Sequence, residues 1–148
     1  MRMPAIREIQ VTEWIDQAWS LFEAHCEEIA QDMLLAPDLD AYCMLEGRGA
    51  LLSLGAFEGD EIVGYSVNLI THNLHHANVT ICQNDILYLR EDKRQGATGL
   101  RLMRETERMA KERGAHMVIW HAKPETNLSG ILPRMGYDVR QVCYARMI

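Results

Sequence analysis

A short loop with three small residues, Arg94-Gln95-Gly96-Ala97-Thr98-Gly99, lies between an apolar run and a helical pattern. Small residues let the backbone approach an anion closely, and N–H groups at a helix N-terminus attract negative charge. The loop is therefore a candidate diphosphate site. It is neither a P-loop nor a dinucleotide fingerprint, because Gly-Lys-Ser/Thr and G-x-G-x-x-G are both missing from it. The alternative interpretation is a plain strand-to-helix turn before a solvated basic helix.

One carboxylate precedes the loop, on a strand expected over residues 79–89. Alternation along that strand predicts two faces, with Gln83, Asp85, Leu87 and Leu89 on one and Asn84, Ile86 and Tyr88 on the other. Asp85 is the only carboxylate on the strand, and apolar neighbours would strip its hydration and suit it to general-base work. The alternative is that Asp85 pairs with an arginine or caps a loop.

Histidines gather just before this strand. His72, His75, His76 and Cys82 are potential metal ligands, but their spacing does not fit a zinc site, so we predict no metal. His75 or His76 could instead line an acceptor pocket and carry a proton, and His121 is another candidate for that role. Neither a nucleophile elbow nor the spacing of a Ser or Cys triad is present in the sequence.

The 148 residues, 48% hydrophobic and 24% charged, predict a single globular domain over residues 1–148. The net charge of −6 argues against a protein that coats nucleic acid or an anionic membrane. This charge is divided unevenly. Residues 1–89 carry three basic and fourteen acidic side chains, a net of −11, whereas residues 90–148 carry twelve and seven, a net of +5.

No apolar run reaches the ~18–20 residues that span a bilayer, and no signal-peptide core follows the N-terminus, so we expect a cytoplasmic protein without a membrane partner. Four cysteines without C-x-x-C spacing predict reduced thiols that are mostly buried.

Hydrophobic periodicity predicts the elements that position the loop. We expect a strand over residues 5–10, a long amphipathic helix from Thr12 whose apolar stripe includes Trp19 and Met33, and a shorter helix after Pro37. A β-hairpin turns at residues 58–61, and Gly64 marks either a bulge or a close approach in its second strand. After the strand over 79–89 we expect a helix over 99–113, a strand over 116–120, a helix over 126–135 and a last strand over 137–147. This order predicts an α/β protein with a mixed sheet and helices on both faces.

The loop resembles a known family. Residues 94–99 match the R/Q-x-x-G/A-x-G/A signature of the GNAT superfamily of acyl-CoA-dependent N-acyltransferases, with Leu-Tyr-Leu ahead of it at the usual distance. Residues 59–65 look like the hairpin and third strand of that family, residues 117–120 like its fifth strand, and Asn127 with Met135-Gly136-Tyr137 like its closing segment. The compact end is similar to short bacterial and phage members. The resemblance implies a mixed sheet of six to seven strands flanked by about four helices, splayed between the fourth and fifth strands.

The resemblance also implies acetyl-CoA as co-substrate and no metal. Backbone amides of the loop would bind the CoA diphosphate, and the main chain of Leu87 and Leu89 would pair with the pantetheine arm. The side chains of Arg94 and Asn127 would approach the cofactor. The expected cofactor-binding residues are Leu87, Leu89, Arg94, Gln95, Gly96, Ala97, Thr98, Gly99, Leu100 and Asn127.

Catalysis in this family is direct attack of a primary amine, on a small molecule or a protein, at the thioester. Asp85 or His75 would remove the amine proton, and a backbone N–H near Leu89 would stabilise the oxyanion. The tyrosine usual in the family four residues before the final glycine is Leu132 here, so Tyr88, Tyr137, Tyr144 or water would protonate the thiolate. Two alternatives stay open: a CoA-binding regulatory module without turnover, and a structural protein that uses the fold as a scaffold. A homodimer is compatible with the sequence.

Overall fold

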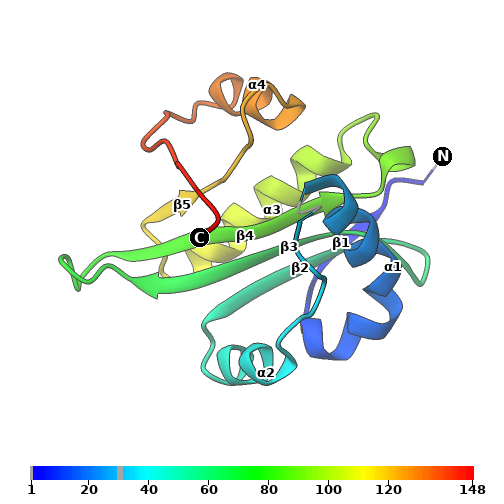
Figure 1. Cartoon of the computed structure of the whole chain (residues 1–148), viewed down its shortest axis with the longest axis horizontal. Coiled ribbons are helices and arrows are strands. Elements are labelled where there is room, and N and C mark those ends of the chain that lie inside the picture. Colours follow the sequence, from blue (N-terminus) through cyan, green and yellow to red (C-terminus); the bar gives the residue numbers. More distant parts are fainter. Residues whose placement is uncertain (1, 30–31) are drawn as a thin grey trace.

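The computed structural model describes residues 2–29 and 32–148, which build one five-stranded sheet with helices on both faces (Figure 1). The strand order is β1-β2-β3-β4-β5, with the first four antiparallel to their neighbours and β5 parallel to β4. The elements are β1 (Ala5–Ile9), α1 (Val11–Ile29), α2 (Leu39–Gly47), β2 (Leu51–Glu58), β3 (Glu61–His72), β4 (Thr80–Leu89), a short 3-10 turn (Glu91–Lys93), α3 (Thr98–Glu112), β5 (Met117–Ile119) and α4 (Asn127–Arg134).

Two apolar clusters lie on opposite faces of the sheet. Helix α1 and part of α2 cover one face, where Phe22, Phe57 and Tyr65 are buried. Helix α3 covers the other face, where Leu54, Cys82 and Leu102 are buried. The predicted α/β class with a mixed sheet is therefore confirmed.

The predicted stripe of α1 is correct at some of its positions and wrong at others. Ile15, Ala18 and Phe22 are buried against the sheet, together with Leu21 and His25. Trp19 was expected in the stripe but is 39% exposed, and Ile29 near the end of the helix is 43% exposed. Met33 follows the helix and is 62% exposed, so its place in the stripe is also corrected.

Gly64 is both a close approach and part of a bulge, so both interpretations left open for it hold. Ala56 pairs with Gly64 and Phe57 with Ile62, which leaves Val63 as the extra residue. A Cβ at Gly64 would lie 2.8 Å from Leu89 Cδ1 and 2.9 Å from the backbone oxygen of Tyr88. Only glycine therefore lets β3 lie this close to the end of β4.

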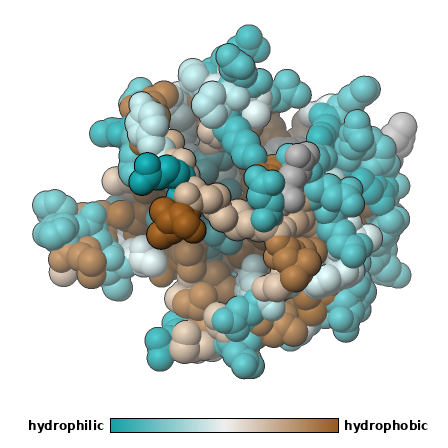
Figure 2. Space-filling view, in the orientation of Figure 1, coloured by the Kyte–Doolittle hydropathy of each residue, from teal (hydrophilic) through white to brown (hydrophobic). Residues whose placement is uncertain are grey.

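The sheet has five strands instead of the six or seven expected, because residues 137–147 do not form the predicted last strand. The edge strand β5 has only three residues and offers few backbone groups to a further strand. A groove beside it is lined by Met117, Val118 and Tyr137 among others. The final residues leave Val139 and Tyr144 exposed, and hydrophobic side chains lie in the open near the C-terminus in Figure 2.

In the described part of the chain, no helix is both long enough and apolar enough to cross a membrane. Likewise, no group of three or more His, Cys, Asp or Glu side chains within residues 2–29 and 32–148 is placed to hold a metal ion. Only Cys82 of the four cysteines is buried, so the expectation of mostly buried thiols is corrected. Burial raises the pKa of the Cys82 thiol to about 11.

Candidate functional site

The loop before α3 presents a row of unused backbone donors. Helix α3 begins at Thr98 after Ala97, which makes no side-chain cap. Among the described residues, the N–H groups of residues 95–100 donate to no protein acceptor. Gly96 has a φ of +114°, a conformation that side-chain-bearing residues rarely adopt. The backbone here is arranged so that several N–H groups remain available for an anion.

The end of β4 has a free edge. Within β4, strand β5 pairs only with Ile81, Cys82 and Gln83, so the two strands separate after Gln83. The predicted splay between the fourth and fifth strands is therefore confirmed. Arg90 N donates to Val63 O at 2.9 Å, which directs the main chain of Arg90 toward β3. By alternation, the main-chain groups of Leu87 and Leu89 point the opposite way, into the splay. The oxygen of Leu89 accepts a hydrogen bond from Arg94 Nε at 2.7 Å.

A β-bulge at Asp85 changes the two faces predicted for β4. Val67 pairs with Ile86 and Asn68 with Asn84, so Asp85 has no partner on β3. The alternation restarts after Asp85. Gln83 therefore shares a face with Ile86 and Tyr88, whereas Asn84 shares the other face with Leu87. The face assignment made from regular alternation is wrong at this point.

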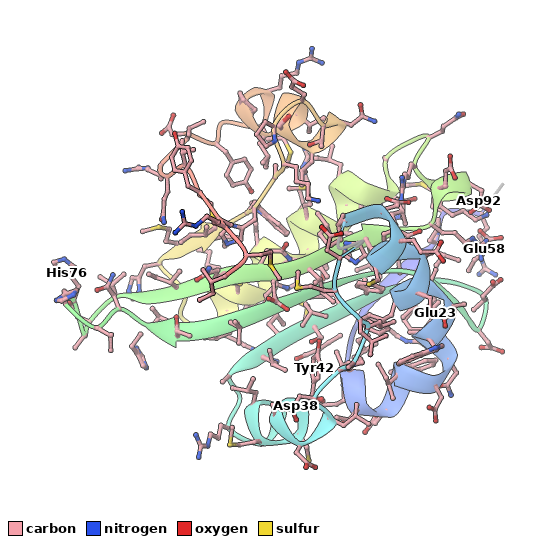
Figure 3. The ribbon with its side chains drawn as sticks, viewed as in Figure 1. Glu23, Asp38, Tyr42, Glu58, His76 and Asp92 are labelled. Carbon is pink, nitrogen blue, oxygen red and sulfur yellow. The ribbon has the colours of Figure 1, made fainter. Side chains whose placement is uncertain are left out.

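Asp85 lies at the bulge with an exposed side chain, so apolar neighbours do not enclose it as expected. The charge of Asp85 influences the hydroxyl of Tyr42 in α2. Burial raises the pKa of the Tyr42 hydroxyl, and the negative charges of Asp85 and Glu46 raise it further. Figure 3 shows Tyr42 between α2 and the sheet. On the β5 side, Gln83 Nε2 lies 3.1 Å from His121 Nε2. The sequence carried no signal that would have singled out Tyr42.

Tyr88 is buried in the cluster under α1. Its ring stacks on His25 with centroids 4.8 Å apart, and the Arg94 guanidinium lies 5.2 Å from the centre of the Tyr88 ring. Burial raises the pKa of Tyr88. His25 Nδ1 lies 2.9 Å from Tyr65 Oη, and burial raises the pKa of that hydroxyl also. Tyr88 thus packs against α1 and does not line the splay with Asp85.

His25 makes the stability of the fold depend on pH. Burial lowers the pKa of His25 below its ordinary value of 6.5, opposed by the charge of Glu28 and assisted by Arg94 and Lys123. Below pH 6.5 the unfolded chain binds a proton at this residue more readily than the folded chain, so stability falls as the pH falls from 6.5. Urea denaturation at pH 7.5 and pH 5.5 measures this loss. His25→Gln is expected to show a smaller loss between the two, and an equal loss would contradict the role of His25.

Two other predicted site residues lie elsewhere. His75 belongs to the β3–β4 turn, where its N–H and that of His76 donate to Asn73 Oδ1. Figure 3 shows His76 at the tip of this hairpin, at the far end of the molecule from Asp92. His75 lies beyond the His72–Thr80 pair at the hairpin end of the ladder, whereas Asp85 lies opposite Val67 and Asn68, so the fold does not bring His75 to Asp85. Asn127 begins α4 and is exposed, while Thr126 and Ser129 form the capping box of that helix.

The basic side chains near the loop are engaged in ion pairs. Arg90 pairs with Glu61 at 2.6 Å, Lys93 with Glu58 at 2.5 Å, and Arg94 with Glu28 at 2.7 Å. Each pair joins the basic second part of the chain to its acidic first part. The unengaged groups of the loop are thus its backbone N–H donors, while an anion would have to compete for the arginine and lysine side chains.

This sheet, with its splay after the fourth strand and its loop opening into α3, has the fold of the GNAT acetyltransferases, as the sequence resemblance implied. The chain is similar to an aminoglycoside acetyltransferase from an uncultured soil metagenomic sample, solved with trehalose and with sisomicin, at 16% identity and a TM-score of 0.78, covering 99% of this chain and 97% of that one. It is also similar to a ribosomal-protein-alanine N-acetyltransferase from Brucella melitensis biovar Abortus 2308, at 15% identity and a TM-score of 0.79, covering 99% of both chains.

A transcriptional regulator from Bacillus halodurans C-125 is similar as well, at 17% identity and a TM-score of 0.74, covering 98% of this chain and 99% of that one. No family model and no curated protein sequence matches the chain. At these identities the likeness establishes the fold, and the activity must be argued from the residues.

Proposed function

We propose that the protein is an N-acetyltransferase that moves an acetyl group from acetyl-CoA to a primary amine on a small molecule or a protein. The observation that carries this proposal is that unpaired backbone N–H groups of the loop lie near the end of β4 that β5 does not pair with. The free N–H groups of residues 95–100 suit the diphosphate, and the main chain of Leu87 and Leu89 suits the pantetheine arm. A plain strand-to-helix turn would not need the positive φ of Gly96 beside a free strand edge.

The loop residues fit the diphosphate of acetyl-CoA mainly through their backbone N–H groups. The diphosphate is held by backbone N–H groups from Gln95 to Leu100, and Arg94 adds its charge by exchanging Glu28 for a phosphate oxygen. This exchange is inexpensive because an exposed ion pair contributes only about 0–1 kcal/mol. Asn127 remains a proposed contact from the start of α4.

The transfer itself needs a base, an oxyanion donor and an acid. Asp85 takes a proton from the amine, whose nitrogen forms a bond to the thioester carbonyl carbon. The backbone N–H of Leu87 or Leu89 stabilises the oxyanion. The C–S bond then breaks, and the CoA thiolate takes a proton from water. The raised pKa of Tyr42 makes its hydroxyl a weaker acid than an ordinary tyrosine, so Tyr42 is not assigned this step. Tyr88 packs under α1 and is left out of this scheme.

A positively charged acceptor fits the surface around Asp85. Glu46 adds a second carboxylate near Tyr42 and receives hydrogen bonds from Thr12. The exposed Asp85 carboxylate beside the splay, with Glu46 contributing to the negative charge around Tyr42, would favour a cationic amine by electrostatic steering.

Thermal-shift titration followed by a thiol-release assay tests the proposal. Acetyl-CoA at a hundred times its Kd should stabilise the protein by about 2.7 kcal/mol, which raises Tm by roughly 5–10 °C. Thiol release should then depend on an added amine. No shift with millimolar acetyl-CoA would overturn the proposal, and a shift without thiol release across a broad amine panel would favour the CoA-binding module without turnover.

Gly96→Ala is expected to weaken CoA binding. The positive φ of Gly96 costs a side-chain-bearing residue about 1–3 kcal/mol, which corresponds to a rise in Kd of roughly fivefold to a hundredfold if the loop relaxes away from this conformation. Isothermal titration calorimetry with CoA measures the change. Gly114→Ala is the matched control, because Gly114 also has a positive φ, of +86°, but follows the C-terminal end of α3, at the opposite end of that helix from the loop. Equal Kd values for Gly96→Ala and the wild type would contradict the proposed role of the loop.

A further inference from the structure

Four buried polar side chains form a hydrogen-bonded row under the α3 face of the sheet. Thr106 of α3, Ser66 and Asn68 of β3, and Asn84 of β4 are each at most 3% exposed. Thr106 Oγ1 lies 3.1 Å from Ser66 Oγ, Asn68 Nδ2 donates to Ser66 Oγ at 3.0 Å, and Asn84 Nδ2 donates to Asn68 Oδ1 at 2.9 Å. The row crosses the sheet from the helix to the strand that carries the bulge.

The two asparagine amides have fixed orientations. Asn68 Nδ2 donates both to Ser66 Oγ and to Leu52 O, at 2.9 Å, so its Oδ1 must face β4. Asn84 Nδ2 donates a hydrogen bond to that oxygen. Turning either amide over would place two oxygens against each other in a water-excluded site, which is costly. The row therefore specifies one arrangement of β3 against β4.

Asn84, the last side chain of the row, spans the bulge. Asn84 Nδ2 also donates to Ile86 O at 3.0 Å, so one side chain ties together the residues on either side of Asp85. A weaker contact of 3.4 Å joins it to Val67 O, opposite Ile86. The side chain of Asn84 thus closes the loop of backbone that the extra residue creates.

The two cores of the protein require this bulge. Cys82 is buried on the α3 face and Tyr88 on the α1 face. Their separation is an even number of residues, so regular alternation would place both side chains on one face. One extra residue between them, Asp85, resolves the conflict.

We propose that Asn84, held by Asn68, is a positioning residue for the acetyl transfer. It keeps the bulge at Asp85, and so sets where the Asp85 carboxylate and the Leu87 main chain lie at the opening of the splay. The inference rests on the proposed function for its catalytic consequence. Its structural part, that Asn84 maintains the bulge, stands without any turnover.

Asn84→Leu tests the inference, because leucine has a similar volume and no donor. Turnover should fall by about tenfold to a hundredfold, as expected for a small displacement of reacting groups. The KM for acetyl-CoA should rise by a smaller factor than kcat falls, since the loop at residues 95–100 is untouched and only the Leu87 main chain is displaced. Among the amides of residues 85–87, that of Ile86, which is paired with Val67 on β3, should exchange faster relative to the amides of β2.

Thr106→Val is the matched control, since it also replaces a buried polar group by an apolar one but lies at the far end of the row. Its hydroxyl is satisfied within α3 by Leu102 O at 2.8 Å. This variant should keep kcat and the exchange rates at residues 85–87. An equal fall in kcat for Thr106→Val and Asn84→Leu would overturn the inference.

Unchanged kcat and unchanged exchange at residues 85–87 in Asn84→Leu would overturn it as well. If Asn84→Leu does not fold, Asn84→Ser is measured in the same way, because serine keeps one donor but cannot reach both Asn68 and Ile86. Unchanged exchange and kcat in Asn84→Ser then overturn the inference. A wild-type protein without turnover would remove the proposed function, while the exchange measurement would still decide whether Asn84 maintains the bulge.

Discussion

Asp85→Asn is expected to lower kcat by about a hundredfold or more near neutral pH, because removal of a general base typically costs a factor of 10² to 10⁴. The substitution keeps the size of the side chain and its place on the bulge. CoA binding should therefore be unchanged, and a thermal-shift titration with CoA should give the wild-type Kd. Thiol release at saturating acetyl-CoA and amine measures kcat.

Asp60→Asn is the control for Asp85→Asn, since Asp60 is an exposed carboxylate in the turn between β2 and β3. It should leave kcat within about twofold, as surface substitutions usually have small effects. A kcat near wild type in Asp85→Asn would show that water or another group removes the amine proton. Equal losses in both variants would show that net charge, and not a base at position 85, governs the rate.

Gly64→Ala is expected to destabilise the protein by about 2–3 kcal/mol, within the range for overpacking a close-packed interior. The new Cβ would lie 2.9 Å from the oxygen of Tyr88 and 3.3 Å from Leu89 Cα, so the backbone of β4 itself would have to move. The same movement would displace the Leu89 main chain at the splay. Urea denaturation should show a lower midpoint with the slope unchanged, and the Kd for CoA should rise.

Gly130→Ala is the matched control for Gly64→Ala. A Cβ at Gly130 would meet nothing within 4 Å, and the residue lies inside α4. Alanine there should stabilise the protein by up to about 1 kcal/mol through helix propensity. Wild-type stability in Gly64→Ala would show that β3 and β4 can separate freely at this point.

The uneven charge of the chain has a different meaning in the folded protein than in the sequence. In the sequence, the basic excess after residue 90 surrounds the loop that is the candidate diphosphate site. In the fold, Arg90, Lys93 and Arg94 pair with glutamates of the acidic first part, and Arg113 pairs with Glu8. Charge complementarity within the chain thus accounts for much of the division. The proposed diphosphate site depends mainly on backbone N–H groups.

Local patterns predicted most of the elements. The helix after the loop, the hairpin at residues 58–61 and the splay after the fourth strand follow from periodicity, turn residues and the family resemblance. The prediction of a last strand over residues 137–147 was wrong, since a strand needs a neighbouring edge to pair with and β5 offers only three residues. His75 was chosen for its residue type alone, and loop residues give no information about which end of a hairpin lies near a site.

Residue type and spacing were enough to indicate the loop at residues 94–99, its Gly96 and the only carboxylate on β4. These features are local, because each is defined by residues that are close together in the sequence. The tertiary structure decided which way the side chains of β4 point. The bulge at Asp85 exists because Cys82 belongs to the core under α3 and Tyr88 to the core under α1. Membership in a core depends on helices distant in sequence, so alternation along one strand could not reveal where it breaks.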